Sequence, residues 1–278
     1  MKTLLVIGGS GFFGKSILDA YGRGRLAPWD IDRIIVVGRS ADRFNAFPAL
    51  HYPGVEFLRA DITTAETLPA ADIVIHAAAS TDEASYRENP DAESRNVHAG
   101  TANYCRIARQ YHRASQIVYV SSGAVYGVQA PDIYGVPEVL SEASIALMPD
   151  GKRQYAIAKR QSEQIVQTLA HDGLAVSIAR CFAFVGRWLP RNQHFAIGNF
   201  IEDGLRGRPV TVKACTPVYR SYMHADDLVT WLMTIAAHAA PMENTAAGCP
   251  VYNVGSPEAV LMGDLAKMVA DCFGVAAQ

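Results

Sequence analysis

A short apolar run near the N-terminus leads directly into a turn rich in glycine. Residues Leu4–Ile7 have the composition of a buried strand, and Gly8, Gly11 and Gly14 follow before a pattern typical of a helix. Glycines at these places allow a tight turn, a close approach of backbone to a phosphate, and close packing of helix on strand. The segment therefore predicts a strand–turn–helix unit whose helix N-terminus faces a phosphate group.

Apolar runs and helical patterns alternate along much of the remaining chain. The predicted strands are Leu4–Ile7, Ile34–Val37, Ile73–Ile75, Ile117–Val120 and Val176–Ala179. The predicted helices include Gly14–Tyr21, Asn96–Tyr111 and Tyr155–Ala170. Strands that are apolar on both faces and alternate with helices indicate a parallel sheet covered on both sides. We expect an α/β fold, a Rossmann-type doubly wound parallel sheet with a smaller C-terminal lobe that binds substrate.

Two regions interrupt this alternation. Residues Val128–Gly151 are rich in proline and glycine and predict a long loop, a kind of segment that is commonly functional. Residues Gly186–Tyr222 carry several Pro, Gly and Arg residues and predict a separate lobe. We therefore expect a dinucleotide-binding domain over 1–185, to which the chain returns at about 217–258. The substrate-binding lobe then consists of residues 186–216 and 259–278.

Composition narrows the classes of partner. The formal net charge of the 278 residues is -2 without a basic stripe, which argues against nucleic acid or an anionic membrane surface as a partner. The five cysteines are scattered without a CxxC pair, so we expect no disulfide framework, no metal site and a reducing cytoplasm. The first apolar run ends at Gly8, too early for a signal peptide or a membrane span.

The glycine turn also fits a different motif. Gly9, Gly14, Lys15 and Ser16 satisfy the spacing of a P-loop, which is the alternative of a nucleotide kinase or NTPase. That alternative needs a second strand that ends in Asp to hold magnesium. The predicted strands end instead in Gly-Arg, His and Ser, so the dinucleotide interpretation is preferred.

The end of the second strand bears on the type of dinucleotide. An NAD site places Asp or Glu there, on the ribose 2′-hydroxyl. This chain has Gly38, Arg39 and Ser40 after Val37. The guanidinium of Arg39 is suited to a 2′-phosphate, so NADP(H) is the preferred cofactor, with NAD(H) left open.

The candidate catalytic residues are Ser122, Tyr155 and Lys159. Tyr155 and Lys159 are four residues apart and share one face of a predicted helix. A nearby ammonium stabilises a phenolate and so promotes proton exchange by a phenol at neutral pH. Ser122 follows the predicted strand Ile117–Val120, at the carboxyl end where ligands bind in parallel sheets. The neighbouring Ser121 is the less favoured serine.

These residues together resemble the extended short-chain dehydrogenase/reductase family, in its nucleotide-sugar branch. The resemblance covers nearly the whole chain. Its further motifs are Ala60-Asp61-Ile62, His76-Ala77-Ala78-Ala79, Asn96-Val97, Arg180–Gly186 and Arg220–Asp227.

The resemblance implies a set of contacts. Cofactor contacts are expected from Gly8, Ser10, Gly11, Phe12, Phe13, Gly14, Arg39, Ser40, Asp61, Ile62, Ala77, Ala78, Tyr155, Lys159 and Phe182. Asp61 and Ile62 would contact adenine, and Phe182 would lie near the nicotinamide. Contacts with a nucleotide-diphosphate sugar are expected from Thr81, Ser122, Asn199 and Arg220, with Arg220 on the diphosphate. His76 and His224 are expected to satisfy local hydrogen bonds, and the family implies a homodimer.

Two small residues narrow the expected reaction. Family 4,6-dehydratases carry Asp-Glu directly after the catalytic Ser or Thr, where this chain has Gly123 and Ala124. Family epimerase-reductases use a Cys at the position of Gly123. Reduction of a 4-keto group and 4-epimerisation remain, and Arg39 favours an NADP(H)-dependent reductase of a nucleotide-linked 6-deoxy sugar. Ala183 stands where many relatives have Asn in contact with substrate. These residues do not identify the base or the sugar of the nucleotide-linked substrate.

Overall fold

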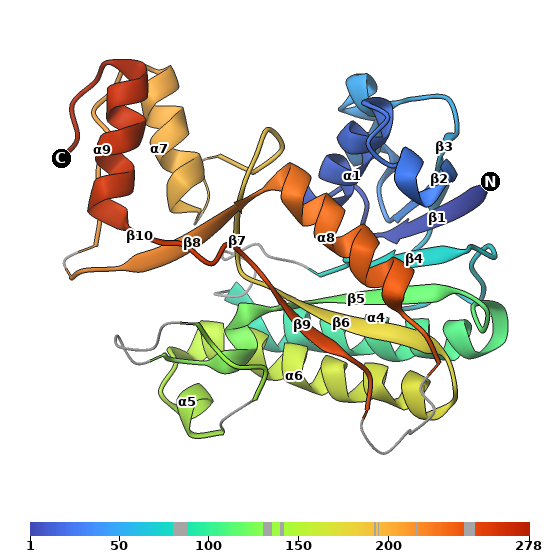
Figure 1. Cartoon of the computed structure of the whole chain (residues 1–278). Coiled ribbons are helices and arrows are strands. Elements are labelled where there is room, and N and C mark those ends of the chain that lie inside the picture. The colour runs from blue at the N-terminus through green and yellow to red at the C-terminus, as the bar shows by residue number, and fades with distance from the viewer. Residues whose placement is uncertain are drawn as a thin grey trace.

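The computed structural model describes residues 1–79, 88–129, 135–139, 142–191, 193, 195–214, 216–241 and 248–278. These described residues form a seven-stranded parallel sheet in the order β3-β2-β1-β4-β5-β6-β9 (Figure 1). The strands are β1 (Lys2–Ile7), β2 (Ile31–Gly38), β3 (Val55–Arg59), β4 (Ile73–His76), β5 (Gln116–Ser122), β6 (Ala175–Cys181) and β9 (Val251–Val254). The prediction of a Rossmann-type parallel sheet is confirmed.

Helices cover both faces of this sheet. On one face lie α1 (Phe12–Gly22) and α8 (Ala225–His238), and on the other α4 (Pro90–Tyr111) and α6 (Asp150–His171) (Figure 1). Leu4 and Val6 of β1 pack in the first core, whereas Leu5 and Ile7 pack in the second. Successive side chains of a strand point to opposite faces, which is why these strands are apolar throughout.

A second sheet of three short strands lies beside the first. It consists, in the described residues, of β10 (Ala259–Leu261), β8 (Tyr219–His224) and β7 (Ala183–Val185). Helices α7 (Ala196–Leu205) and α9 (Met262–Phe273) pack together next to it, around the buried side chains of Phe200 and Met262 (Figure 1). The predicted boundaries place β7 and β8 in the dinucleotide-binding domain, yet both pair in this smaller sheet. The division of the chain into two domains stays a proposal.

The predicted loop Val128–Gly151 contains helical residues. The short helix α5 (Glu142–Ala146) lies within it, and α6 begins at Asp150 rather than at Tyr155. The side chain of Ile145 is buried where α5 packs on α6, and burial of an apolar side chain stabilises even a single helical turn. The carboxylate of Asp150 in the first turn interacts favourably with the positive N-terminal end of the α6 dipole. Tertiary contacts therefore overrode the loop-like composition.

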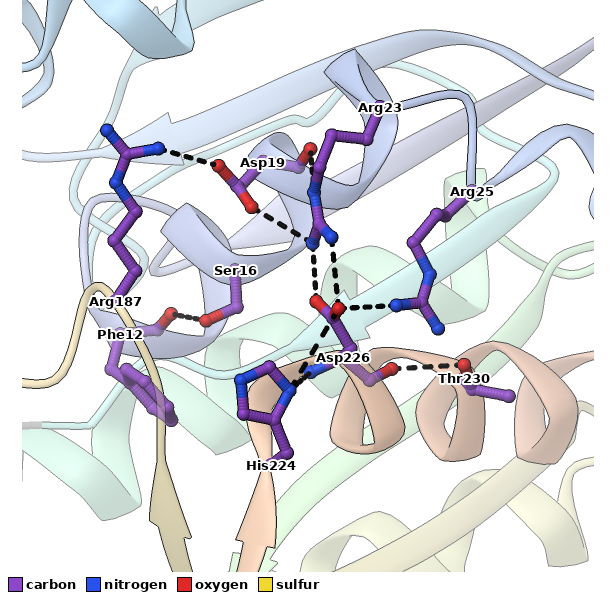
Figure 2. A network of polar contacts seen from close by, with 9 residues as sticks. All are labelled: Phe12, Ser16, Asp19, Arg23, Arg25, Arg187, His224, Asp226 and Thr230. Atoms are coloured by element: carbon purple, nitrogen blue, oxygen red, sulfur yellow. Dashed lines mark hydrogen bonds and ion pairs between the residues drawn. The ribbon is translucent and has the colours of Figure 1, made fainter. Parts of the chain in front are cut away.

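An ionic network joins α1, which follows the glycine turn, to α8, which follows β8 (Figure 2). Asp226, in the first turn of α8, accepts hydrogen bonds from the guanidinium groups of Arg23 and Arg25, which directly follow α1. Arg23 also contacts Asp19 on α1 at 3.0 Å. The hydrogen bond from Arg23 is the main cause that lowers the pKa of Asp226. The network thus links α1 to the helix that continues from β8.

Two further features bear on the class of protein. Among the described helices, none is both long enough and apolar enough to cross a membrane. In the same described part of the chain, no group of three or more His, Cys, Asp or Glu residues is arranged to hold a metal ion.

Candidate active site

The glycine turn leaves no space for a side chain at Gly8 or Gly14. Gly8 has a φ of +86°, and a Cβ added there would lie 2.7 Å from the Cα of Ala78. A Cβ on Gly14 would lie 2.1 Å from the carbonyl oxygen of Gly9. Helix α1 has no side-chain cap at Gly11, so its first N–H groups are available to an anion. This bare backbone at a helix N-terminus fits the pyrophosphate of a dinucleotide.

Arg39 lies at the end of β2, beside the predicted adenine contacts. It is exposed and lines an open hollow of about 380 Å³ together with Arg59, Ala60 and Asp61. Partial burial raises the pKa of Asp61, but hydrogen bonds from Thr63 and the guanidinium of Arg39 lower it overall. The carboxylate of Asp61 is therefore ionised and held within the hollow.

Lys15 lies between the glycine turn and α2 (Ala41–Asn45). Its ammonium stands 3.4 Å from the centroid of the Phe47 ring, a cation–π contact. Burial and the guanidinium of Arg43 lower the pKa of Lys15. Lys15 and Arg43 therefore face one another near the end of β2, which concentrates positive charge there. No described strand of the large sheet places an Asp at its end for a magnesium ion, as the P-loop alternative requires.

The predicted catalytic residues come from β5 and α6. Ser122 ends β5 and its Oγ accepts a hydrogen bond from the N–H of Ala124 at 3.2 Å. Lys159 is only 3% exposed, and its Nζ donates to the carbonyl of Val120 at 2.9 Å. Burial lowers the pKa of Lys159, but the phenols of Tyr119 and Tyr155 raise it overall. The structure thus brings the ammonium of Lys159 close to the end of β5 and to Tyr155.

The two neighbouring serines have different surroundings. Ser121 is buried and its Oγ donates to Oε1 of Glu163 at 2.5 Å. Ser122 is partly exposed. Of these two serines, Ser122 therefore presents the hydroxyl that solvent or a substrate can reach, and its catalytic role stays a prediction.

Phe182 packs against the turn that follows these serines. It follows β6, and its ring is stacked on that of Tyr126 with centroids 6.0 Å apart. A Cβ on Gly123 would lie 2.7 Å from Cδ1 of Phe182. The residue predicted to lie near the nicotinamide is therefore adjacent to the serine turn, which we define as residues 121–126.

The predicted substrate contacts lie on other elements. Arg220 is exposed on β8, and its Nη1 donates to the carbonyl of Tyr219 at 2.8 Å. Asn199 is on α7 and donates to the carbonyl of Gln193 at 2.7 Å, while its buried Oδ1 has no hydrogen-bond partner among the described residues. Thr81 lies outside the described residues. The substrate roles of these three residues stay predictions.

The expectation that the histidines satisfy local hydrogen bonds is confirmed for His224 and stays a prediction for His76. Nδ1 of His224 accepts a hydrogen bond from the N–H of Asp226 at 3.2 Å. His76 is 1% exposed, and neither of its ring nitrogens has a regular hydrogen bond within the described part of the chain. Burial and then the ammonium of Lys159 lower the pKa of His76 to about 3, and the nearby backbone carbonyls offset only part of this.

Sequence reasoning missed three residues that contact the site. Tyr119 contacts the ammonium of Lys159 with its hydroxyl at 3.4 Å. Glu163 binds Ser121, and Asn253 on β9 accepts a hydrogen bond from Tyr126 at 2.6 Å. Glu163 had one usable signal, because it follows Lys159 by four residues and so shares its helical face. Tyr119 and Asn253 reach the site only through the pairing of strands.

Comparison with known proteins adds to this geometry. A family model described as the NAD dependent epimerase/dehydratase family matches residues 4–255. The chain belongs to this family. The predicted membership among extended short-chain dehydrogenases/reductases is confirmed, and so is the prediction of an NAD(P)-dependent enzyme.

Individual relatives of this family member differ in their reactions. UDP-glucuronic acid decarboxylase 5 of Arabidopsis thaliana is 27% identical over 272 residues, which cover 96% of this chain and 74% of the relative. Among solved structures, the dTDP-glucose 4,6-dehydratase DesIV of Streptomyces venezuelae, with NAD and TYD bound, matches with a TM-score of 0.79. It is 21% identical, with coverage of 99% of this chain and 83% of that chain.

A UDP-glucose 4-epimerase from Thermotoga maritima, solved with UDP-glucose, matches with a TM-score of 0.73. It is 19% identical, and the match covers 99% of this chain and 84% of that one. At such identities the two structures share the fold with this chain. The family has accommodated several reactions on this fold, so the reaction must be argued from the site itself.

Proposed function

We propose that this protein uses NADP(H) to reduce the 4-keto group of a nucleotide-linked 6-deoxy sugar. The observation that carries the proposal is the packing of Phe182 on Gly123, the residue that directly follows Ser122. The proposed chemistry uses the hydroxyl of Ser122, the phenol of Tyr155 and the ammonium of Lys159, which lies close to the end of β5. The site has an aromatic ring at the place where an additional acid for the removal of water would stand.

These side chains divide the work of a carbonyl reduction. A bound nicotinamide supplies hydride exchange at the reacting carbon. The hydroxyl of Ser122 donates a hydrogen bond to the carbonyl oxygen, which stabilises the negative charge that develops there. Tyr155 gives its phenolic proton to the same oxygen, and the ammonium of Lys159 stabilises the phenolate that is left.

The preference for NADP(H) is supported by the charges around the end of β2. Arg39 takes the place of the carboxylate that an NAD site would use, and Lys15 and Arg43 lie nearby. Guanidinium and ammonium groups suit a 2′-phosphate, whereas a ribose 2′-hydroxyl has no need of them. Solved relatives hold NAD, among them WbmF of Bordetella bronchiseptica, so this preference would distinguish the present protein.

The second candidate is a nucleotide-sugar 4-epimerase with bound NAD(P). The same Ser122, Tyr155 and Lys159 would serve it, and the lack of an acid at Gly123 agrees with it equally. Arg39 favours the reductase, because a reductase must exchange its cofactor at every turnover and NADPH is the usual source of reducing power. We further propose, from the family resemblance, that the protein binds a nucleotide-diphosphate sugar through Arg220 and acts as a homodimer in the cytoplasm.

A cofactor-consumption assay tests the proposal. NADPH and NADH are each supplied with a panel of nucleotide-linked 4-keto-6-deoxy sugars, and oxidation of the cofactor is followed. We expect NADPH to be oxidised faster than NADH with at least one sugar of the panel. Interconversion of UDP-glucose and UDP-galactose without net cofactor consumption would establish the epimerase instead. Release of carbon dioxide from UDP-glucuronic acid would replace both candidates.

A further inference from the structure

A buried ion pair contacts the serine turn. Glu163 follows Lys159 by one helical turn on α6, and Arg180 lies on β6. Nη2 of Arg180 stands 2.7 Å from Oε2 of Glu163, and both side chains are only 3% exposed. Replacement of a buried ion pair by apolar side chains often leaves a protein as stable or more so, hence stability alone does not account for this pair.

Within the described part of the chain, the remaining side-chain hydrogen bonds of this pair lead to the serine turn and to residues 135–139. Oε1 of Glu163 accepts from Ser121 Oγ at 2.5 Å. Nη1 of Arg180 donates to the hydroxyl of Tyr126 at 2.9 Å and to the carbonyl of Glu138 at 2.9 Å. The ion pair therefore links α6, which carries Tyr155, to the end of β5, which carries Ser122.

Asn253 holds residues 135–139 from the other side. Its Nδ2 donates to the carbonyl of Val136 at 2.5 Å, and its backbone N–H donates to Oε1 of Glu138 at 3.3 Å. Its Oδ1 accepts from the hydroxyl of Tyr126 at 2.6 Å. Residues 136–138 are thus bound at the carboxyl ends of β6 and β9, on the edge of the sheet where ligands bind in this class of fold.

We propose that Glu163, Arg180 and Asn253 are positioning residues of this enzyme. The ion pair binds Ser121 and so fixes Ser122 relative to Tyr155. Arg180 and Asn253 fix residues 136–138 as one wall of the sugar site. The second part rests on the proposed function, because it assumes that a nucleotide sugar occupies the site.

Two kinetic variants separate these roles. Glu163→Gln keeps the shape of the side chain but removes its charge, and we expect kcat to fall roughly 10–100-fold through misplacement of the serine, with NADPH affinity unchanged. Asn253→Ala removes the bonds to Val136 and Tyr126, and we expect KM for the sugar to rise roughly tenfold with kcat near normal. Asn253→Asp keeps the acceptor for Tyr126 but replaces the donor to Val136 by a charged oxygen, so it should share the rise in KM.

Val166→Ala is the matched control. Val166 lies on α6 within three residues of Glu163, is buried in the apolar core and makes none of these polar contacts. The substitution should lower Tm while leaving the hydrogen bonds of Glu163, Arg180 and Asn253 in place. If Glu163→Gln and Val166→Ala lose Tm equally and keep equal kcat and KM, the ion pair has a merely structural role and the proposal is overturned.

Hydrogen exchange tests the positioning without a substrate. We expect the backbone of residues 135–139 to exchange faster in Asn253→Ala and Arg180→Lys than in the unmodified protein and in Val166→Ala. This result would support the role of Arg180 and Asn253 in fixing residues 136–138 even if the protein turned over no nucleotide sugar. In that case only the proposed function fails. Unchanged exchange in both variants would overturn this role of Arg180 and Asn253, whatever the substrate is.

Discussion

The ring of Phe182 lies so close to the α-carbon of Gly123 that an added Cβ would stand 2.7 Å from its Cδ1. On its other side a Cβ on Gly255 would stand 3.3 Å from the Cβ of Phe182. The aromatic side chain is therefore confined between two glycines. The family resemblance implies an Asp at position 123 in a dehydratase, and this packing explains why an acid cannot simply be placed there.

Gly123→Asp should destabilise the protein, because the ring of Phe182 must move. The expected cost is about 1–3 kcal/mol of unfolding free energy, the usual range for an overpacked site. Urea unfolding of Gly123→Asp, Phe182→Ala and the double variant measures it. The Asp should cost less in the Phe182→Ala background, and an equal cost in both backgrounds would show that the ring is not the obstacle.

Tyr155→Phe and Lys159→Ala should each lower the rate of turnover by about 10²–10⁴-fold, since one removes the proton donor and the other removes the charge that stabilises the phenolate. Steady-state kinetics with the sugar identified by the assay above gives the rates. Circular dichroism and thermal unfolding serve as controls for folding. A purified Tyr155→Phe enzyme with near-normal activity would remove the proposed mechanism.

Arg39→Ala should weaken NADP(H) binding by about 1.5–3 kcal/mol, the scale of a hydrogen bond to a charged group, and should leave NAD(H) binding little changed. Titration calorimetry with both cofactors gives the two affinities. Equal weakening of both, or tighter binding of NAD(H) by the unmodified protein, would refute the assignment of Arg39 to a 2′-phosphate.

Arg220→Ala should raise KM for a nucleotide sugar, while NADPH affinity stays near normal. A diphosphate clamp on β8 contributes to uniform binding of the substrate and to no step of the chemistry. Lys15→Ala should leave this KM close to its normal value. Magnesium-dependent ATP consumption that disappears in Lys15→Ala, with intact sugar binding in Arg220→Ala, would instead favour the P-loop alternative.

The stability of the protein should fall on mild acidification because of His76. Its pKa is about 3 in the folded protein, below the ordinary value of 6.5 that an unfolded chain has. The unfolded state therefore binds more protons between these values, and stability is lost as the pH falls through this window, by at most about 1.4 kcal/mol per pH unit for this group. Urea unfolding of His76→Leu at pH 7 and pH 5 should show a smaller loss than the unmodified protein. An identical loss would mean that other groups control the acid sensitivity.

Local patterns were sufficient for the framework of the molecule and for its predicted chemistry. The strands β1, β2, β4, β5 and β6 were visible because a strand buried on both faces must be apolar throughout. The edge strand β3 escaped notice because its sequence is polar at exposed positions, with Glu56 and Arg59 at the surface. Tyr155 and Lys159 could be paired from sequence because helical geometry alone places them on one face.

Contacts between distant segments were decided only by the tertiary structure. No local sequence pattern indicates that Phe182 fills the space beside Gly123, that Glu163 accepts a hydrogen bond from Ser121, or that Asn253 binds Val136. Each of these contacts depends on the order of the parallel strands, which brings the carboxyl ends of β5, β6 and β9 together. The sequence by itself therefore determined the alternation of strands and helices and the predicted catalytic groups on β5 and α6. Strand order and packing decided which serine is accessible and which side chains hold it in place, because those depend on neighbours that are remote in the chain.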